Sequence, residues 1–188
     1  MIRGVIFDMD GTITVPYIDW KALRAEIRAP QGSTLIEYIE SLDKDERRWA
    51  TGVLERRENE AAIHSELNEG VRELLDVLKV RGIRTALVTN NNGQSMRLVL
   101  EKHGLCFDVT LSREDGRIKP SADLVLKAIE RLGLDREEVV LIGDGRYDLW
   151  ASEEAGIPFI LLKHPGNEMD HRPAVTSLEE APALLSLR

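Results

Sequence analysis

Five short apolar runs recur along the chain and predict strands that are buried on both faces. The runs cover residues 2–7, 85–88, 107–111, 139–142 and 159–162. Each run is shorter than most helices and shows no alternation of apolar and polar positions, which is typical of a parallel sheet with helices on both sides. Cys106 immediately precedes the third run, so we expect it to be buried and inert.

Apolar residues between these runs recur with helical spacing. They predict helices around residues 71–78, 96–100, 124–132, 147–155 and 178–187. Glycines are expected at the ends of the first four helices, and Pro120 near the start of the third. The glycines are Gly82, Gly104, Gly133 and Gly156. Strands that alternate with helices indicate an α/β fold with a doubly wound parallel sheet.

Residues 15–66 interrupt this alternation. They contain no strand pattern, and they predict two or three amphipathic helices instead. We therefore predict an α/β core domain, formed by residues 1–14 and 67–188, with a small α-helical cap inserted at residues 15–66.

Local patterns inside the insert support helices. Thr34 with Glu37, and Asp43 with Glu46, have the spacing of capping boxes, in which a helix-starting side chain and an acid three residues later satisfy backbone N–H groups. The chain has three tryptophans, which we interpret as packing residues of the insert and of a helix on the sheet: Trp20, Trp49 and Trp150.

Charge and hydropathy narrow the range of partners. The chain has 33 acidic and 25 basic residues, for a formal net charge of −8. Nucleic acid and anionic membranes repel such a protein, so neither is expected as a partner. No apolar run approaches the ~20 residues of a membrane span, and no signal segment precedes the first strand. We expect a cytoplasmic protein without disulfides, and both a monomer and a homodimer stay open.

The first predicted strand ends in two carboxylates, Asp8 and Asp10, which are followed by Gly11 and Thr12. The carboxyl ends of strands in an open α/β sheet form the binding crevice, so these acids lie where a site is expected. Two carboxylates this close repel each other, and a hard divalent cation would compensate for this. An ordinary aspartate–glycine turn is the alternative interpretation.

Polar residues also follow the other predicted strands. Thr89 and Asn90 follow the second strand, where a hydroxyl and backbone N–H groups can bind an anion. Lys119 comes after the third strand, just before Pro120. Asp144 and Asp148 follow the fourth strand, one helical turn apart, so that both can face one cation. Taken singly, each of these residues could equally be a helix cap or a solvated side chain.

The order of these residues along the chain is Asp-x-Asp-Gly-Thr, then Thr, then Lys-Pro, then Gly-Asp-x-x-x-Asp. In this order the chain closely resembles the haloacid dehalogenase superfamily of phosphotransferases. The resemblance covers nearly the whole chain. The helical insert is similar to the cap of the phosphoglycolate phosphatase and β-phosphoglucomutase branch, and it is shorter than that cap usually is.

The resemblance implies a mechanism and a set of roles. Asp8 would be the nucleophile that forms an aspartyl-phosphate, and Asp10 the general acid and base. The phosphate would be bound by Thr89, Asn90 and Lys119. Mg²⁺ would be held by Asp8, the Asp10 backbone carbonyl, Asp144 and Asp148. The expected enzyme is a phosphatase that acts on a small phosphorylated metabolite.

Other functions stay open at this stage. A phosphomutase of the β-phosphoglucomutase type would use the same residues for a different reaction. A receiver-like signalling domain also places acids, a threonine and a lysine at strand ends, but its phosphorylated aspartate follows a later strand. A non-catalytic relative would be expected to lack one of the acids. The four histidines do not cluster in the sequence and indicate neither zinc ligands nor essential bases; His164, which follows the fifth strand, is the one that could approach the site.

Overall fold

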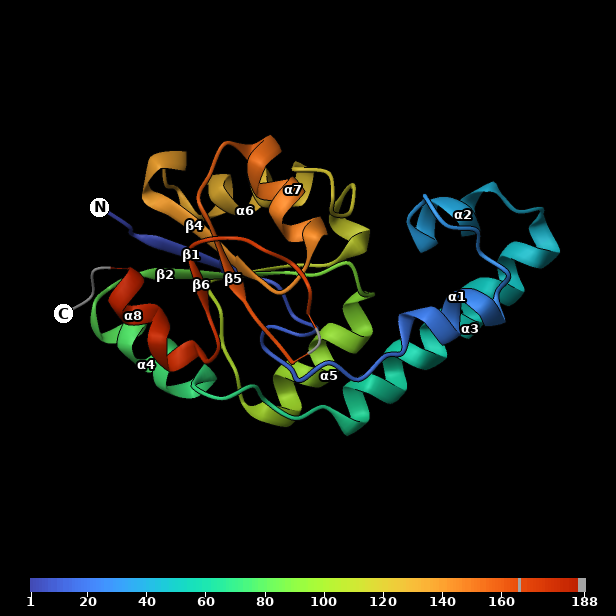
Figure 1. Ribbon diagram of the computed structural model, residues 1–188, viewed down its shortest axis with the longest axis horizontal. Helices are drawn as coiled ribbons and strands as arrows, with labels where there is room; N and C mark the ends of the chain where they lie inside the picture. Colours follow the sequence, from blue (N-terminus) through green and yellow to red (C-terminus); the bar gives the residue numbers. More distant parts are fainter. Residues whose placement is uncertain (166, 186–188) are drawn as a thin grey trace.

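The computed structural model describes residues 1–165 and 167–185. Its centre is a parallel sheet of six strands in the order β3-β2-β1-β4-β5-β6 (Figure 1). The strands are β1 (Gly4–Phe7), β2 (Arg84–Val88), β3 (Val109–Leu111), β4 (Val139–Gly143), β5 (Phe159–Leu162) and β6 (Ala174–Val175). The predicted α/β fold with a parallel sheet is confirmed. The two-residue strand β6 was not predicted.

Helices cover both faces of the sheet (Figure 1). On one face lie α4 (Val71–Val80), α5 (Gly93–His103) and α8 (Ala181–Leu184), and on the other α6 (Asp123–Leu132) and α7 (Arg146–Ala155). Each face has its own apolar core, because the side chains of a strand alternate between the faces. In β1, Val5 and Phe7 belong to one core and Ile6 to the other.

The helix ends follow the sequence pattern with two differences. Helices α5, α6 and α7 end in left-handed glycines, namely Gly104, Gly133 and Gly156. Helix α6 begins at Asp123, so the expectation that Pro120 lies near its first position is wrong. The predicted last helix is a 3₁₀ turn, Leu178–Glu180, followed by the short α8, and residues 186–187 of that prediction lie outside the described residues.

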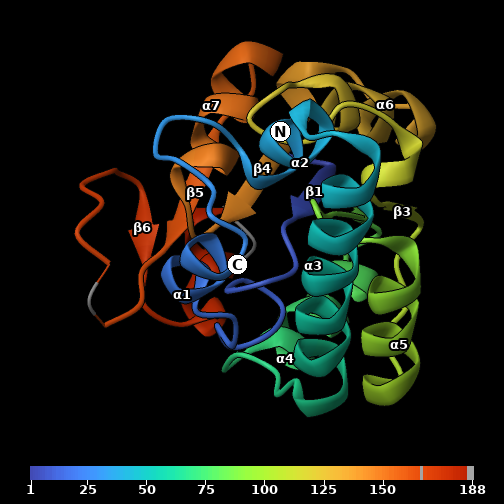
Figure 2. The ribbon, with the colours of Figure 1, turned by 90° about the vertical axis from the view of Figure 1, so that its right-hand side faces the viewer.

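Three helices form the insert between β1 and α4: α1 (Trp20–Glu26), α2 (Leu35–Ser41) and α3 (Lys44–His64). They share a separate apolar cluster that includes Leu23, Ile39 and Leu54. The Thr34–Glu37 capping box is present at the start of α2. Figures 1 and 2 show that the C-terminal part of α3 runs beside α5, which joins the insert to the core.

Several residues expected to be buried are exposed. Trp20, Trp49 and Trp150 have 43%, 47% and 44% of their surface exposed, so their interpretation as core residues is wrong. In α7, for example, Trp150 lies on the side of the helix opposite to the buried residues Asp148, Ala151 and Ala155. Cys106 is also exposed, because it lies in the connection before β3 rather than in a strand. Among the described residues, no helix has the length and apolar character needed to cross a membrane.

Candidate active site

The register of the sheet brings the predicted strand ends together. Phe7, the last residue of β1, pairs with Leu87 of β2 and Ile142 of β4. The residues that follow these three strands therefore meet at one edge of the sheet. This edge carries Asp8, Thr89 and Asp144, as expected where parallel strands end side by side.

Lys119 lies at the centre of this edge and is 2% exposed. Its Nζ atom donates to Asp8 Oδ1 at 2.5 Å, to Asp148 Oδ1 at 2.7 Å and to the Val88 carbonyl at 3.0 Å. Three acceptors satisfy the three protons of an ammonium group. Burial lowers the pKa of Lys119, but the carboxylates of Asp148 and Asp8 outweigh it and raise the pKa above its ordinary value. Lys119 is therefore a fixed positive charge between two acids.

The backbone of Lys119 is held by the side chain of Asn90. Asn90 Nδ2 donates to the Lys119 carbonyl at 2.8 Å, and the Lys119 N–H donates to Asn90 Oδ1 at 2.9 Å. Lys119 lies in the turn before α6, next to a cis peptide bond with Pro120. Helix α6 begins only at Asp123, so the Asn90 amide, rather than a helix start at Pro120, holds the backbone of Lys119.

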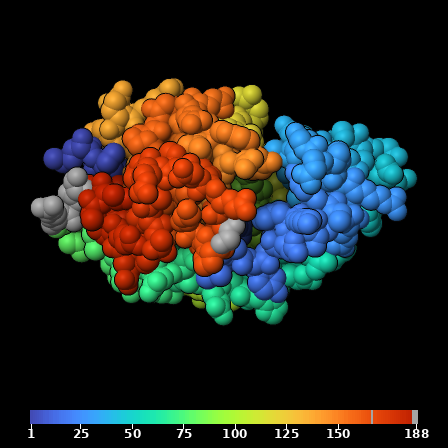
Figure 3. Space-filling model, in the orientation of Figure 1, coloured from blue at the N-terminus to red at the C-terminus, as the bar shows by residue number. Residues whose placement is uncertain are grey.

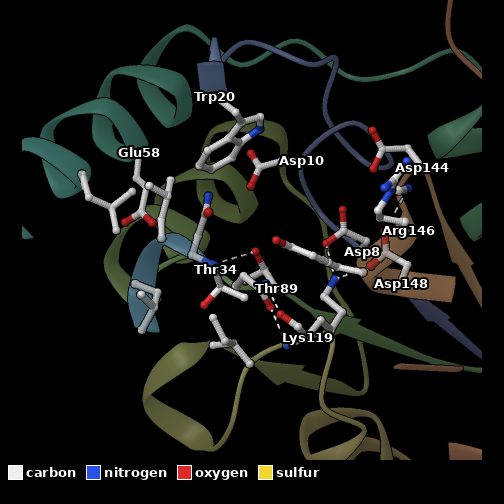
Figure 4. Close-up of a pocket in the computed structure, with 18 of the residues that line it drawn as sticks. Asp8, Asp10, Trp20, Thr34, Glu58, Thr89, Lys119, Asp144, Arg146 and Asp148 are labelled. Atoms are coloured by element: carbon white, nitrogen blue, oxygen red, sulfur yellow. Dashed lines mark hydrogen bonds and ion pairs between the residues drawn. The ribbon is translucent and has the colours of Figure 1, made fainter. Parts of the chain in front are cut away.

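Three carboxylates form a group that can hold a cation. Asp8, Asp144 and Asp148 each offer one oxygen, and these oxygens lie within 4.8 Å of one another. A set of carboxylate oxygens suits a hard cation such as Mg²⁺ or Ca²⁺. The Asp10 carboxylate is not part of this group. In Figure 4 it lies between Asp8 and Trp20, toward the insert.

The turn after Asp10 requires glycine. Gly11 has a φ of +83°, and a Cβ atom at this position would overlap the Asp144 carboxylate. The left-handed backbone conformation and the lack of a side chain both favour glycine here. Gly11 thus lets the first strand end and the Asp144 carboxylate approach each other closely.

Burial shifts the acids of the site toward their protonated forms. Burial raises the pKa of Asp8 to about 7; Lys119 opposes the rise, and the charges of Asp148 and Asp144 add to it. Burial, followed by the negative charge of Asp148, raises the pKa of Asp144 to about 7. Burial also raises the pKa of Asp10 to about 7, with further contributions from the charges of Asp8 and Glu58. An acid with a pKa near 7 can both donate and accept a proton at neutral pH.

Asn68 and His164 hold the turn that carries Gly11. Asn68 Nδ2 lies within hydrogen-bonding distance of three carbonyl oxygens, those of Gly11 (3.1 Å), Thr12 (3.0 Å) and Thr14 (3.0 Å). His164 Nε2 contacts the Gly11 carbonyl, so this histidine does lie next to the site. The sequence pattern did not indicate Asn68, because a lone asparagine after an insert resembles any loop residue.

A buried ion pair joins the insert to the core. Glu58 of α3 is 2% exposed, and its carboxylate accepts from Arg113 Nη1 at 2.5 Å and from Asn92 Nδ2 at 2.5 Å. Arg113 lies just after β3, and Asn92 is the N-cap of α5. Sequence analysis missed this pair. The sequence does contain one indication of it. Glu58 is four residues from Leu54 and from Ala62, so it lies on the same face of the helix as these two buried residues.

A cavity of about 350 Å³ lies between the insert and the edge of the sheet. Figure 3 shows the hollow between the blue insert and the orange part of the core. All seven predicted site residues line this cavity: Asp8, Asp10, Thr89, Asn90, Lys119, Asp144 and Asp148. Thr89 is 1% exposed, and its hydroxyl accepts from the Asn91 N–H at 3.1 Å. Figure 4 shows the acids and Lys119 on one side of the cavity, with Trp20 and Glu58 facing them from the insert.

Comparisons with known proteins agree on one family. The family model of the haloacid dehalogenase-like hydrolases matches residues 2–156. A phosphoglycolate phosphatase from Thiobacillus denitrificans is 28% identical, over 98% of this chain and 96% of its own length. A pyrophosphatase from Halalkalibacterium halodurans is 28% identical, over 83% of this chain and 81% of its own length.

Solved structures show the same fold. The crystal structure of a haloacid dehalogenase-superfamily hydrolase of subfamily IA from Geobacter sulfurreducens superposes with a TM-score of 0.71 and 24% identity. The match covers 98% of this chain and 100% of the other. The likeness therefore includes the helical insert as well as the sheet.

Proposed function

This chain belongs to the haloacid dehalogenase-like hydrolases and is a phosphatase of that type, and on this premise we propose that it hydrolyses a small phosphate monoester through an aspartyl-phosphate on Asp8. The observation that carries the proposal is the buried Lys119, which joins Asp8 and Asp148 beneath a cavity with three carboxylates that can hold one cation. Lys119 fixes one oxygen of Asp8 and so orients the nucleophile.

In the first step a carboxylate oxygen of Asp8 forms a bond to phosphorus. The bond from phosphorus to the leaving oxygen breaks, and this oxygen takes the proton of Asp10 and departs as an alcohol. Asp10 suits this role because its pKa of about 7 keeps a large protonated fraction at neutral pH. Asp10 lies between Asp8 and Trp20, where it would face an alcohol that leaves toward the insert.

In the second step Asp10, now a carboxylate, takes a proton from water. The water oxygen bonds to phosphorus while the bond from phosphorus to Asp8 breaks. One ester and one water molecule thus give one alcohol and one inorganic phosphate, and both aspartates return to their starting forms. General acid–base catalysis of this kind contributes roughly 10²- to 10⁴-fold to the rate.

The phosphoryl oxygens would be bound by the Thr89 hydroxyl, the Asn90 backbone N–H and Lys119, whose Nζ would exchange one of its three present acceptors for a phosphoryl oxygen. Phosphoryl transfer depends mainly on positioning and on stabilisation of charge, so these donors count as much as the nucleophile. The Asn90 side chain is hydrogen-bonded to the backbone of Lys119. These bonds fix the position of Asn90 relative to Lys119, the residues that provide two of the three donors.

The carboxylates of Asp8, Asp144 and Asp148 fit Mg²⁺ as side-chain ligands, and the backbone carbonyl of Asp10 would be a fourth ligand. When bound, the ion would reduce the repulsion between the anionic nucleophile and the anionic substrate. Lys119 offsets part of the same negative charge, because it is the positive group between two of the three carboxylates.

The test compares Asp8→Asn with Asp10→Asn on p-nitrophenyl phosphate. Asp8→Asn should have no turnover, because no covalent phosphate can form. Asp10→Asn should release one p-nitrophenolate per enzyme in a burst and then turn over slowly, since this leaving group needs little protonation but hydrolysis still needs a base. Mass spectrometry should locate the phosphate on the peptide that contains Asp8. A phosphate elsewhere, or wild-type activity of Asp8→Asn, would refute the mechanism.

A further inference from the structure

The wall of the cavity that faces the leaving group comes mainly from the insert. The phosphate-binding residues and the catalytic acids lie at the sheet edge, whereas the opposite wall is mostly apolar or aromatic, with Arg24, Thr34 and Glu58 as its polar members. Its side chains are Trp20 of α1, Leu35 and Ile36 of α2, Leu54 of α3, and Ile118 from the core loop before Lys119. The part of a substrate that extends away from its phosphate therefore meets carbon atoms.

Two charged residues of the insert also line the cavity, and both are engaged. Arg24 donates from Nη1 to the Pro30 carbonyl at 2.8 Å and from Nη2 to the Ser33 carbonyl at 2.5 Å. These bonds tie the guanidinium to the loop between α1 and α2. The carboxylate of Glu58 is bound by Arg113 and Asn92. Both charges are therefore anchored within the protein, and a ligand would reach only those N–H groups of Arg24 that these two bonds do not use.

The third charged residue of the wall lies on another side. The Arg146 guanidinium is 5.9 Å from the ring centre of Trp150, and Figure 4 shows Arg146 beside Asp144. It is thus placed toward the carboxylate group rather than toward Trp20. Among the described residues that line the cavity, the cations therefore lie beside the acids or are anchored to the loop, and most of the wall around Trp20 is apolar.

A polar leaving group would find few partners here, because most of this wall is apolar and Thr34 and Arg24 are its main polar donors. Hydroxyl, carboxylate or second phosphate groups that lie against Leu35, Ile36 and Leu54 would be left unsatisfied, which is costly for buried polar groups. An apolar group gains from the same burial. Trp20 is 43% exposed, so a flat or branched apolar group can still cover much of its indole ring.

We propose that the substrate is the phosphate monoester of a compact apolar alcohol, aromatic or branched aliphatic, whose carbon skeleton packs between Trp20 and the wall formed by Leu35, Ile36 and Leu54. This inference rests on the proposed phosphatase function. The cavity volume of about 350 Å³ limits the alcohol to roughly the size of one ring, since the phosphate occupies part of the space. Trp20 is the main specificity-determining contact.

The test uses benzyl phosphate and glycerol 3-phosphate. Both are esters of primary alcohols, so the chemistry at phosphorus is similar while the leaving groups differ in polarity. The wild-type protein should have a kcat/KM for benzyl phosphate about 10²-fold above that for glycerol 3-phosphate, which is the order of discrimination that an apolar pocket provides. Phosphoglycolate and pyrophosphate should be poorer substrates than benzyl phosphate.

Variants assign the preference to one residue. Trp20→Ala should lower kcat/KM for benzyl phosphate by roughly 10- to 100-fold and change that for glycerol 3-phosphate little, because only the apolar ester uses the indole. Trp20→Phe should keep most of the preference. Trp49→Ala is the matched control, since Trp49 is an equally exposed tryptophan of the insert outside the cavity lining; both rates should stay at wild-type values.

The outcomes separate this inference from the proposed function. Hydrolysis of p-nitrophenyl phosphate together with a higher kcat/KM for glycerol 3-phosphate, phosphoglycolate or pyrophosphate than for benzyl phosphate would overturn the inference alone. An equal effect of Trp20→Ala on both esters would also overturn it. A complete lack of hydrolysis of every ester, p-nitrophenyl phosphate included, would overturn the phosphatase function and this inference with it.

Discussion

The ion pair between Glu58 and Arg113 allows a quantitative prediction, because both side chains are largely withdrawn from water. Their side chains are 2% and 13% exposed, and the closest atoms are 2.5 Å apart. Replacing Arg113 by Met leaves the Glu58 carboxylate buried, with the Asn92 amide still donating to it. Breaking a buried pair in this way costs about 3–5 kcal/mol. For a chain of this length that loss corresponds to a fall of roughly 6–20 °C in Tm.

The measurement is a double-mutant cycle on the free energy of unfolding in urea. Glu58→Gln removes the charge but keeps an oxygen that can accept from Asn92. The double variant Glu58→Gln with Arg113→Met should therefore be more stable than Arg113→Met alone, because it no longer buries a lone charge. Arg57→Met is the control: Arg57 neighbours Glu58 but pairs with Glu26 and Glu60 on the surface, and its loss should leave the midpoint of unfolding unchanged.

The pH dependence gives the cycle a second readout. Burial raises the pKa of Glu58, and Arg113 is the largest opposing influence. Without Arg113 the folded protein should take up a proton at Glu58 at a higher pH than the wild type does. The deficit of Arg113→Met should therefore be full at pH 8 and smaller at pH 5. An equal deficit at both pH values, or a double variant no more stable than Arg113→Met, would refute the reasoning.

Three further predictions concern the acids and their cations. Lys119→Met should lower kcat by about 10²-fold or more, because a preorganised donor is lost, and steady-state kinetics with a circular dichroism check of folding would measure this. Activity should vanish in EDTA and return with Mg²⁺ but poorly with Ca²⁺, whose larger ligand shell suits the site less; full activity without metal would contradict the site. In metal-free buffer the free energy of unfolding should fall as pH rises from about 4 to about 7, because Asp8, Asp10 and Asp144 have pKa values of about 7 in the folded protein against 3.8 otherwise. Urea unfolding between pH 4 and 7 measures this, and the fall in the free energy of unfolding should be smaller with Mg²⁺ present. A free energy of unfolding that rises with pH in metal-free buffer would show that the raised pKa values are wrong.

The sequence was most informative where one physical cause dominates. Strands buried on both faces must be apolar throughout, so β1, β2 and β4 could be predicted from their composition alone. The edge strand β6 has two residues, Ala174 and Val175, which is too short for any pattern. Periodicity placed Trp20 on the same helical face as Leu23, but it cannot say whether the edge of that face meets another helix or a cavity.

The residues of the site also divide into those that the sequence could predict and those that it could not. Asp8, Thr89 and Asp144 could be predicted because the ends of parallel strands meet at one edge. The side-chain role of Asn90 could not be predicted, because its partner Lys119 lies 29 positions away and is positioned by the fold. The same holds for Glu58, whose partner Arg113 is 55 positions away. Pairings across such distances leave no local pattern in a single sequence.

Because α3 is one continuous helix, a small rotation near the core moves the distant part of the insert by a larger distance. This helix has 21 residues, and its apolar contacts change from the cluster of the insert to the core along its length. From Glu58, where it is fastened to the core, to Lys44 it measures about 21 Å. A rotation of α3 by roughly 5° about Glu58 moves Lys44 by about 2 Å. Helix α2, which carries Leu35 and Ile36, is connected to this end of α3. Weakening the ion pair between Glu58 and Arg113 would therefore allow a small rotation of α3 and a larger displacement of α2. This displacement would change the shape of the cavity, so a mutation at this ion pair could alter which substrate is preferred.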